Sequence, residues 1–299
     1  DSARLLAADE EAETLYRRAL RLLAQSDGAD MARRGRALLR LGQVRANQLD
    51  FSGAQECYEQ AFALLEAGGA NTVRRRAAAK QRRAIRLGVS PYGPATLDPG
   101  LIETVGDEEI VPDLFEGLVE LDGELNLLPG LARRWRIDDA GRRYHFELRP
   151  GLRWSDGAPL TAHDLVFAWR RNLNPATGAA MAELLDIVAG ATEWRSGATT
   201  DPDELGISAL DDLHFEVELT APLAHFLYLL ADPITFPQPR HTIARYGTDA
   251  FRPERLVGNG PFRIAAWRAG GEIILERNPY YHGVAGAGVD RAVLRFVEP

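Results

Sequence analysis

The sequence lacks most of the residues and motifs on which enzyme and metal sites depend. Among its 299 residues there is one cysteine, Cys57, which excludes an internal disulfide bond and any CxxC metal or redox site. The six histidines form neither an HExxH motif nor an i, i+4 pair, so we expect no metal site. Gly-rich phosphate loops and a GxSxG nucleophile elbow are missing as well. We therefore predict a protein that is not an enzyme and that carries no cofactor.

Positively charged residues are outnumbered by negatively charged ones, and long apolar runs are absent from the sequence. The formal net charge is −8 and the sequence pI is about 5.4, which argues against nucleic acid as the main partner. No stretch of about 18 or more apolar residues occurs, so we expect no membrane-spanning helix. Residues 1–13 are acidic and lack the apolar core of a signal peptide, which suggests the start of a shortened or processed chain. The single thiol fits an oxidising exterior as well as a reducing cytoplasm, so composition leaves the compartment open.

What is present divides the chain into two parts, as its length and its 45% apolar residues allow. Residues 1–83 are rich in Ala, Leu, Arg and Glu, contain no proline, and place apolar residues at helical spacing. A repeat with a period of 42 residues is visible, in which Ala12, Tyr16 and Ala19 recur as Ala54, Tyr58 and Ala61. We therefore predict an all-α helical repeat segment.

The small and large residues of this segment fall in a particular order. Leu38, Leu41 and Gly42, followed by Ala54, Tyr58 and Ala61, resemble the packing positions of the tetratricopeptide repeat. This resemblance implies one full repeat preceded by the second helix of an earlier repeat. An unrelated helical hairpin is the alternative, because any close helix pair needs small residues opposite large ones. In both cases the segment would serve as a spacer or bind a protein partner.

A basic run, Val73–Arg83, ends this first part with the sequence VRRRAAAKQRR. Its charge alone is compatible with a nucleic-acid or anionic-lipid patch. The run is also rich in alanine, however, and cations are favoured at a helix C-terminus. We predict a solvated connector helix.

Beyond Ala84 the apolar spacing alternates between strand and helix periods, which predicts a mixed α/β lobe over residues 84–299. Strands are expected at 85–89, 143–148, 215–219 and 291–297, and a hairpin from 262–267 and 272–276. Helices are expected at 109–119, 162–173, 180–188, 191–195, 224–230 and 241–246. Strands from distant parts of the sequence would share a sheet, so the fold class of the whole chain is α+β.

The stretch Tyr144–Pro175 is the most informative part of this lobe. Apolar and polar residues alternate from Tyr144 to Leu148, as in a half-buried strand, and Asp156-Gly157 then supplies turn chemistry. Thr161 is a good N-cap with Asp164 three residues later, and a helical apolar pattern follows until Asn174-Pro175 stops it. Each of these features is common in folded proteins, but their combination in this order is specific.

This stretch closely resembles the signature region of family 5 extracellular solute-binding proteins, the group that contains the oligopeptide- and dipeptide-binding proteins of ABC importers. Further segments resemble the family in the same order: TLDPGLIETVGDEEIVPDLFEGLVELD, GISALDDLHFEVELTAPLAHFLYLL, GNGPFRIAAW and ILERNPYYHG. The resemblance runs from about Ala84 to Pro299. It implies the first lobe of a type II periplasmic-binding-protein-like fold, with the second lobe absent.

The resemblance also implies a function and a site. Family members hold an extended peptide between two lobes by strand-like main-chain pairing and deliver it to the membrane subunits of an importer. The matching loop residues here are Glu103, Thr104 and Val105, whose N–H and C=O groups are candidates for peptide pairing. The Glu103 carboxylate is a candidate contact for a basic ligand group. Met181 stands where the oligopeptide-binding relatives carry an aromatic contact.

Other expectations follow from the same resemblance. It implies an extracytoplasmic location, although a cytoplasmic one fits the helical segment, and a half-site that binds peptide weakly or not at all. The first alternative function is a ligand-sensing module of a signalling protein, coupled through the helical repeats. A second is a degenerate scaffold, which would show a closed or filled face near Glu103–Val105.

Overall fold

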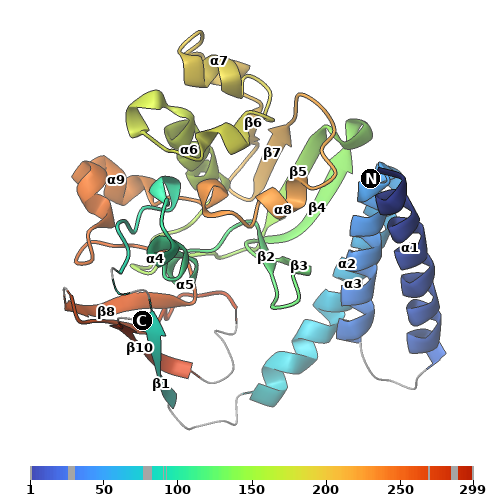
Figure 1. The fold of residues 1–299 in the computed structure, drawn as a ribbon, viewed down its shortest axis with the longest axis horizontal. Coiled ribbons are helices and arrows are strands. Elements are labelled where there is room, and N and C mark those ends of the chain that lie inside the picture. Colours follow the sequence, from blue (N-terminus) through green and yellow to red (C-terminus); the bar gives the residue numbers. More distant parts are fainter. Residues whose placement is uncertain are drawn as a thin grey trace.

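The structure is a computed structural model that describes residues 2–25, 31–76, 83–89, 91, 93–268, 270–283 and 289–297. Three long helices come first and a mixed lobe follows (Figure 1). The helices are α1 (Ser2–Gln25), α2 (Met31–Asn47), α3 (Phe51–Arg76), α4 (Val105–Glu108), α5 (Val111–Leu114), α6 (Ala162–Leu173), α7 (Ala191–Ser196), α8 (Phe226–Leu229) and α9 (Arg240–Tyr246). Among the described helices, none combines the length and apolarity needed to cross a membrane.

The strands form three sheets. They are β1 (Arg83–Val89), β2 (Val119–Leu121), β3 (Leu127–Pro129), β4 (Ala132–Asp138), β5 (Arg143–Leu148), β6 (Ile207–Ala209), β7 (His214–Glu218), β8 (Phe262–Arg268), β9 (Glu272–Arg277) and β10 (Val289–Phe296). One sheet has the order β1-β10-β9-β8, in which only β1 and β10 run parallel, and a second has the antiparallel order β4-β5-β7-β6. Strands β2 and β3 pair as a separate hairpin. Strands far apart in the sequence therefore share sheets, as predicted.

The helical segment packs closely at its small residues. A Cβ atom on Gly42 of α2 would lie 2.6 Å from the Tyr58 ring of α3, and one on Gly35 would lie 2.7 Å from Leu65. Ala54 and Ala61, on either side of Tyr58, are fully buried. These contacts explain why glycine and alanine occupy the positions noted in the sequence. The assignment of this segment to the tetratricopeptide repeats remains a prediction.

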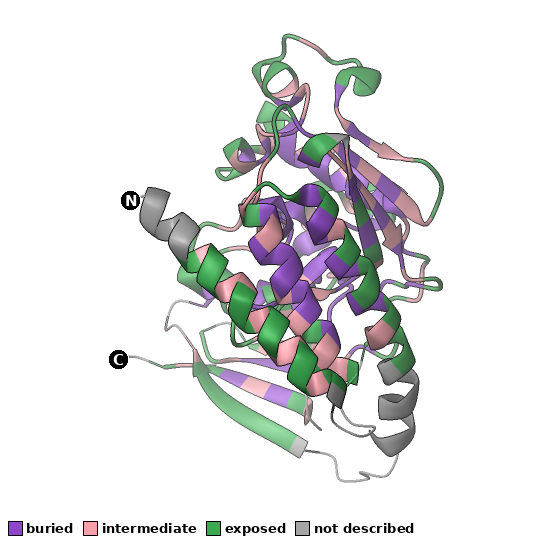
Figure 2. Cartoon of the chain, turned by 90° about the vertical axis from the view of Figure 1, so that its right-hand side faces the viewer, coloured by how far each residue is buried: buried purple, intermediate pink, exposed green. Residues whose placement is uncertain are grey.

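Helix α3 packs against the edge strand β4 through aromatic side chains. The Trp135 ring meets the Phe62 ring edge-on with centroids 4.6 Å apart, and the Tyr58 ring with centroids 5.4 Å apart. Gln55 then satisfies the open edge of β4, because its side chain accepts from the Ile137 N–H at 3.0 Å and donates to the Trp135 carbonyl at 3.5 Å. Figure 2 shows the resulting difference between an exposed α1 and the buried faces of α2 and α3. The helical segment and the lobe thus share one core.

Helix α6 has the bounds that the sequence predicts. The Asp164 carboxylate accepts from the Thr161 N–H at 2.9 Å, which is half of the expected capping box. Trp169 is fully buried, packs edge-on against Phe215 of β7, and donates from Nε1 to the Thr235 carbonyl at 2.8 Å. The tryptophan therefore stabilises the core, where its N–H has a partner.

Three predicted helices are wrong in extent. The helix expected at 109–119 is replaced by the one-turn helix α5, an extended stretch and the start of β2, because the Asn259 side chain binds both the N–H and the carbonyl of Glu116 and holds the chain extended. The helix expected at 180–188 is only a 3₁₀ turn at Ala182–Leu185, since Val188 bridges to Leu219. The helix expected at 224–230 shortens to α8.

The other predicted elements are confirmed to within a few residues, including α7, α9 and the β8-β9 hairpin, whereas strands β2, β3, β4 and β6 were not predicted. The basic connector Val73–Arg83 is described in part. Helix α3 reaches Arg76 and β1 begins at Arg83, and residues 77–82 lie outside the described residues.

Candidate functional site

A cavity of about 380 Å³ lies between the loop before α4, the start of α5 and the segment after α8. It brings together Glu103 and Met181, the two candidate ligand contacts from the sequence that lie far apart along the chain. Its lining residues are Pro99, Gly100, Ile102, Glu103, Glu108, Pro112, Leu121, Met181, Tyr228, Ala231, Asp232, Pro233 and Ile234. This lining contains three carboxylates and, among the residues that the structure describes, no basic side chain. The cavity can therefore attract a cationic group.

The loop beside the cavity is organised by one buried carboxylate, that of Asp107. Oδ1 accepts from the N–H groups of Ala95 and Thr96 at 2.7 and 3.0 Å, and Oδ2 accepts from those of Glu103 and Thr104 at 3.2 and 3.0 Å. Burial opposes the ionisation of Asp107, but these backbone hydrogen bonds outweigh it and lower its pKa below the usual value. Asp107 thus fixes the course of two chain segments at once.

The predicted loop residues are exposed, but not all of their backbone groups are free. Glu103 and Thr104 already donate their N–H groups to Asp107, so pairing of these two N–H groups with a peptide would compete with the bonds inside the loop. The Thr104 carbonyl accepts from Asp107 and Glu108 at the start of α4. The Glu103 carboxylate and the N–H of Val105, a first helical position that has no acceptor within its helix, stay candidates. Whether they contact a ligand remains a prediction.

Sequence reasoning missed Asp107, although a signal was present. Thr104 and Asp107 have the spacing of a capping box, and the structure contains both of its hydrogen bonds. An aspartate three residues after Thr104 indicates a carboxylate that can accept hydrogen bonds from the N–H groups of the loop. The loop is nevertheless open to solvent, with Val105 66% exposed, so the filled face expected of a degenerate scaffold is not seen here.

A buried ion pair supports the opposite side of the cavity. Asp98 directly precedes the lining residues Pro99 and Gly100, and its Oδ2 lies 2.6 Å from Arg171 Nη2 of α6. Arg171 also donates to Gln238 Oε1 at 2.9 Å. A side chain on Gly100 would meet the Asn172 side chain at 2.2 Å, so only glycine fits this approach. The cavity floor is therefore held rigidly by α6.

A second group of titratable residues lies outside the cavity. The His282 Nε2 is 2.8 Å from a carboxylate oxygen of Glu116, and the Tyr281 hydroxyl donates to Glu120 Oε1 at 3.3 Å. Burial raises the pKa of Glu116 and of Glu120 to about 7, and burial lowers the pKa of His282 to about 4. These groups join the beginning of β2 to the segment after β9. They contribute a pH-dependent structural contact.

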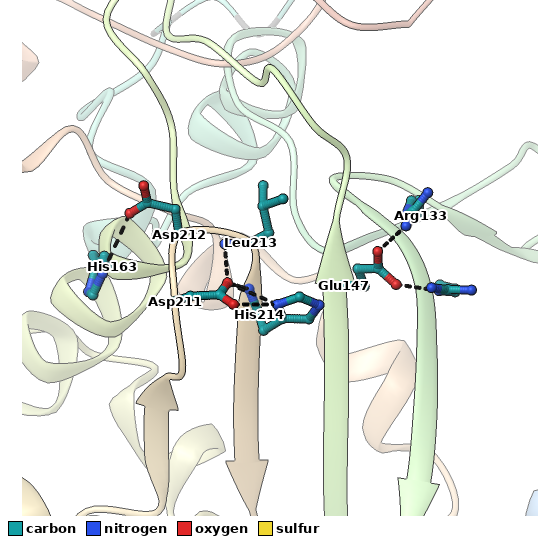
Figure 3. A network of polar contacts seen from close by, with 8 residues as sticks. Arg133, Glu147, His163, Asp211, Asp212, Leu213 and His214 are labelled. Carbon is teal, nitrogen blue, oxygen red and sulfur yellow. Dashed lines mark hydrogen bonds and ion pairs between the residues drawn. The ribbon is translucent and has the colours of Figure 1, made fainter.

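The acidic pair Asp211-Asp212 has a structural role at the turn between β6 and β7, where Figure 3 shows both side chains. Asp211 accepts from the Leu213 N–H at 2.8 Å and lies 2.8 Å from His214 Nδ1, and Asp212 lies 3.7 Å from His163. On the neighbouring strands, Glu147 of β5 pairs with Arg133 and Arg134. Within the described part of the chain, no group of His, Cys, Asp and Glu is arranged to hold a metal ion.

Comparison with known proteins places this geometry in context. The family model of the bacterial extracellular solute-binding proteins, family 5 Middle, matches residues 126–299. The probable deoxycholate-binding periplasmic protein YgiS of Escherichia coli is 43% identical over 197 residues, which cover 63% of this chain and 35% of YgiS. The periplasmic oligopeptide-binding protein OppA of Salmonella typhimurium is 38% identical over 195 residues, which cover 62% of this chain and 34% of OppA.

Solved structures agree with these sequence matches. The crystal structure of Haemophilus influenzae OppA in complex with the peptide RPPGFSPFR superimposes with a TM-score of 0.68 at 33% identity. The superposition covers 72% of this chain and 42% of that chain. The chain spans about a third of the length of the curated relatives that it matches.

Proposed function

Because the chain belongs to the bacterial extracellular solute-binding proteins, family 5, we propose that its cavity receives an oligopeptide for import by an ABC transporter. Proteins of this family bind solutes and do not catalyse reactions. The membrane subunits of the importer would be its partners, and an extracytoplasmic compartment would be its location. The family supports the importer as partner, and the location is supported by two of the named relatives, which are periplasmic proteins.

The observation that carries the proposal is the acidic lining of the cavity beside an exposed loop. Glu103, Glu108 and Asp232 line the cavity without a basic residue to neutralise them. A peptide with an ammonium or guanidinium group would gain charge-assisted hydrogen bonds there. Its main chain could pair with the loop at Glu103 and Val105, which tolerates many side chains because backbone pairing does not depend on them. We therefore favour basic oligopeptides.

A steroid acid is a second candidate solute, because YgiS is named as a probable deoxycholate-binding protein. The apolar side chains of Ile102, Leu121 and Met181 in the lining would suit a steroid. Deoxycholate is an anion, however, and three carboxylates would repel its carboxylate. The charge of the cavity thus supports a basic peptide over deoxycholate.

The lobe also has an exposed edge that supports a half-site. Residues 84–88 of β1 are exposed, including the apolar Ile85 and Leu87, and within the described residues β10 is the one strand that pairs with β1. In a two-lobed binding protein such an edge would lie where the chain crosses between lobes. This lobe by itself leaves one side of a ligand in water, so we expect affinity of these residues alone for peptide near the millimolar range, about −4 kcal/mol.

Ligand-observed NMR with trilysine, triglutamate and deoxycholate would test the proposal. We expect trilysine to bind with a dissociation constant of about 1 mM and the two anions to bind more weakly. Glu103→Gln should weaken trilysine binding by about two- to fivefold, the range of an exposed ion pair. Glu254→Gln is the matched control, since Glu254 is exposed and does not line the cavity.

Three results would count against the proposal. No binding of any peptide at about 10 mM would reject peptide recognition by this lobe, and preferential binding of deoxycholate would favour the second candidate. Equal binding of trilysine by the wild-type and Glu103→Gln chains would remove Glu103 from the site. Binding at micromolar concentration would instead overturn the expectation of a half-site.

A further inference from the structure

Two elements in the wall of the solute cavity also contact the helical segment. Tyr228 belongs to α8 and Leu121 ends β2, and both line the cavity. Just before α8, the Ala224 carbonyl accepts from Gln43 Nε2 of α2 at 3.1 Å. Just after β2, Glu124 Oε2 lies 2.6 Å from Arg40 Nη2 of the same helix. A single helix thus contacts the chain at two places directly beside elements of the cavity wall.

The first contact involves the buried side chain of Gln43, whose nitrogen and oxygen atoms both have hydrogen-bond partners. Gln43 is 6% exposed, and its side chain also donates to Asn47 Oδ1 at 3.0 Å and accepts from the Tyr58 hydroxyl at 3.3 Å. On the lobe side, the Tyr144 hydroxyl donates to the Leu223 carbonyl at 3.5 Å. The segment that enters α8 is therefore held between α2 and the sheet. A movement of this segment would disturb these two partly buried hydrogen bonds.

In the second contact, a hydrogen-bonded turn connects Leu121 to Glu124. Asp122 Oδ1 accepts from the N–H groups of Glu124 and Asn126 at 2.9 and 3.0 Å, so a displacement of Leu121 carries Glu124 with it. Arg40 also acts electrostatically on the other wall residue, Tyr228 of α8. Burial is the largest influence on the pKa of Tyr228 and raises it, and Tyr16 of α1 and Arg40 both add electrostatic effects. The Tyr228 hydroxyl therefore lies within electrostatic range of α1 and α2.

We propose that the helical segment reports occupancy of the solute cavity. A bound peptide that displaces Tyr228 or Leu121 would shift the Gln43–Ala224 and Arg40–Glu124 contacts and so change the stability of α2 and α3. The inference rests on the proposed function, because it requires a solute in the cavity. Packed interfaces of this kind change between discrete arrangements, so a small displacement can alter a whole helix pair.

The coupling must act in both directions. A protein partner that holds α1 and α2 in one arrangement would change the affinity of the cavity for peptide. Peptide would change the affinity of the helical segment for that partner by the same factor. The helical segment lies outside residues 126–299, which the family model matches. It would add a sensing function to a solute-binding lobe.

Hydrogen–deuterium exchange of the full chain with and without about 10 mM trilysine would test this inference. We expect exchange to slow by about threefold or more both at the cavity, in residues 99–105 and 231–236, and in α2 and α3. Gln43→Leu should keep the cavity response and reduce the helix response to less than about half. Arg40→Gln, a more exposed change, should act in the same direction if Gln43→Leu does not fold. Arg17→Gln is the matched control, because Arg17 pairs within α1 with Glu13.

The outcomes separate this inference from the proposed function. A response at the cavity without any response in α2 and α3 would overturn the inference and leave the proposed function intact. A response in the helices that survives both Gln43→Leu and Arg40→Gln would also overturn it, since these contacts would not be the route. No response anywhere would reject the proposed function, and the inference with it.

Discussion

The contact between α3 and β4 differs in kind from the cavity beside Glu103. The contact consists of Tyr58, Phe62 and Trp135, which are buried and touch ring to ring. The cavity is bordered by exposed residues, and its loop is held by hydrogen bonds to the single carboxylate of Asp107. Apolar packing depends on area and shape, whereas the loop depends on the direction of four bonds. The two regions should therefore respond differently to substitution.

Trp135→Ala should have the largest effect. Removing a buried indole from the α3–β4 contact should lower the free energy of unfolding by about 3–5 kcal/mol, as measured by urea denaturation followed by circular dichroism. Trp194→Ala is the matched control, because Trp194 of α7 is only partly buried, and it should cost about 1 kcal/mol. A loss of less than about 1 kcal/mol for Trp135→Ala would mean that this contact does not support the fold.

Asp107→Asn should disturb the cavity loop. The asparagine NH₂ group would oppose the N–H groups of Glu103 and Thr104, which should lower the free energy of unfolding by about 2–3 kcal/mol. Amide exchange at Glu103 and Thr104 should accelerate, while exchange in α3 should stay unchanged.

The same residue gives a pH dependence of known sign. The pKa of Asp107 is lowered in the folded chain, so its stabilising effect is present above the ordinary aspartate pKa of 3.8 and is lost as the pH falls below it. Denaturation at pH 6 and pH 3 would measure this loss, which the Asp107→Asn chain should not show at this site. An equal loss in both chains would assign the acid sensitivity to other carboxyls.

Gly42→Ala tests the packing within the helical segment. The added Cβ would lie 2.6 Å from the buried Tyr58 ring, and the overpacking should lower the free energy of unfolding by about 2 kcal/mol. Gly123→Ala is the control, because nothing lies within 4 Å of a Cβ at that position, and its effect should stay within about 0.5 kcal/mol. Similar values for both variants would show that α2 and α3 are not in close contact at Gly42.

Glu116→Gln should have the smallest effect and should appear only as a change in pH dependence. The pKa values of Glu116 and Glu120 are raised to about 7, so the folded chain keeps protons there that the unfolded chain has released. The free energy of unfolding of the wild-type chain should therefore fall by about 1 kcal/mol between pH 6.5 and pH 8, because proton release from His282 in the unfolded chain, near its ordinary pKa of 6.5, offsets only part of this loss.

Denaturation curves over this pH range would measure the slope. In the Glu116→Gln chain the slope should fall to less than half, because one carboxyl is removed and its neighbour no longer faces a second one. Glu254→Gln should keep the wild-type slope. A slope that is unchanged by Glu116→Gln would place the titrating groups elsewhere.

Prediction from the sequence succeeded where periodicity and caps carry the information. The bounds of α6 follow from Thr161, Asp164 and Asn174, which act on the chain within one or two turns. Prediction failed at 109–119 because the interaction that holds Glu116 extended comes from Asn259, more than a hundred residues away. At the site, Glu103 and Met181 were expected from family resemblance, but their meeting in one cavity was visible only in the structure.

The sequence by itself determined the family and many elements of the lobe, because these depend on local spacing and on motifs in a fixed order. Only the tertiary structure decided that the helical segment is joined to the lobe by a shared aromatic core, and that α2 contacts residues directly beside the cavity wall. It also decided which backbone groups of the loop are already used. The physical reason is that side-chain packing and hydrogen bonds between distant segments depend on where the folded chain places them, and no local pattern encodes that placement.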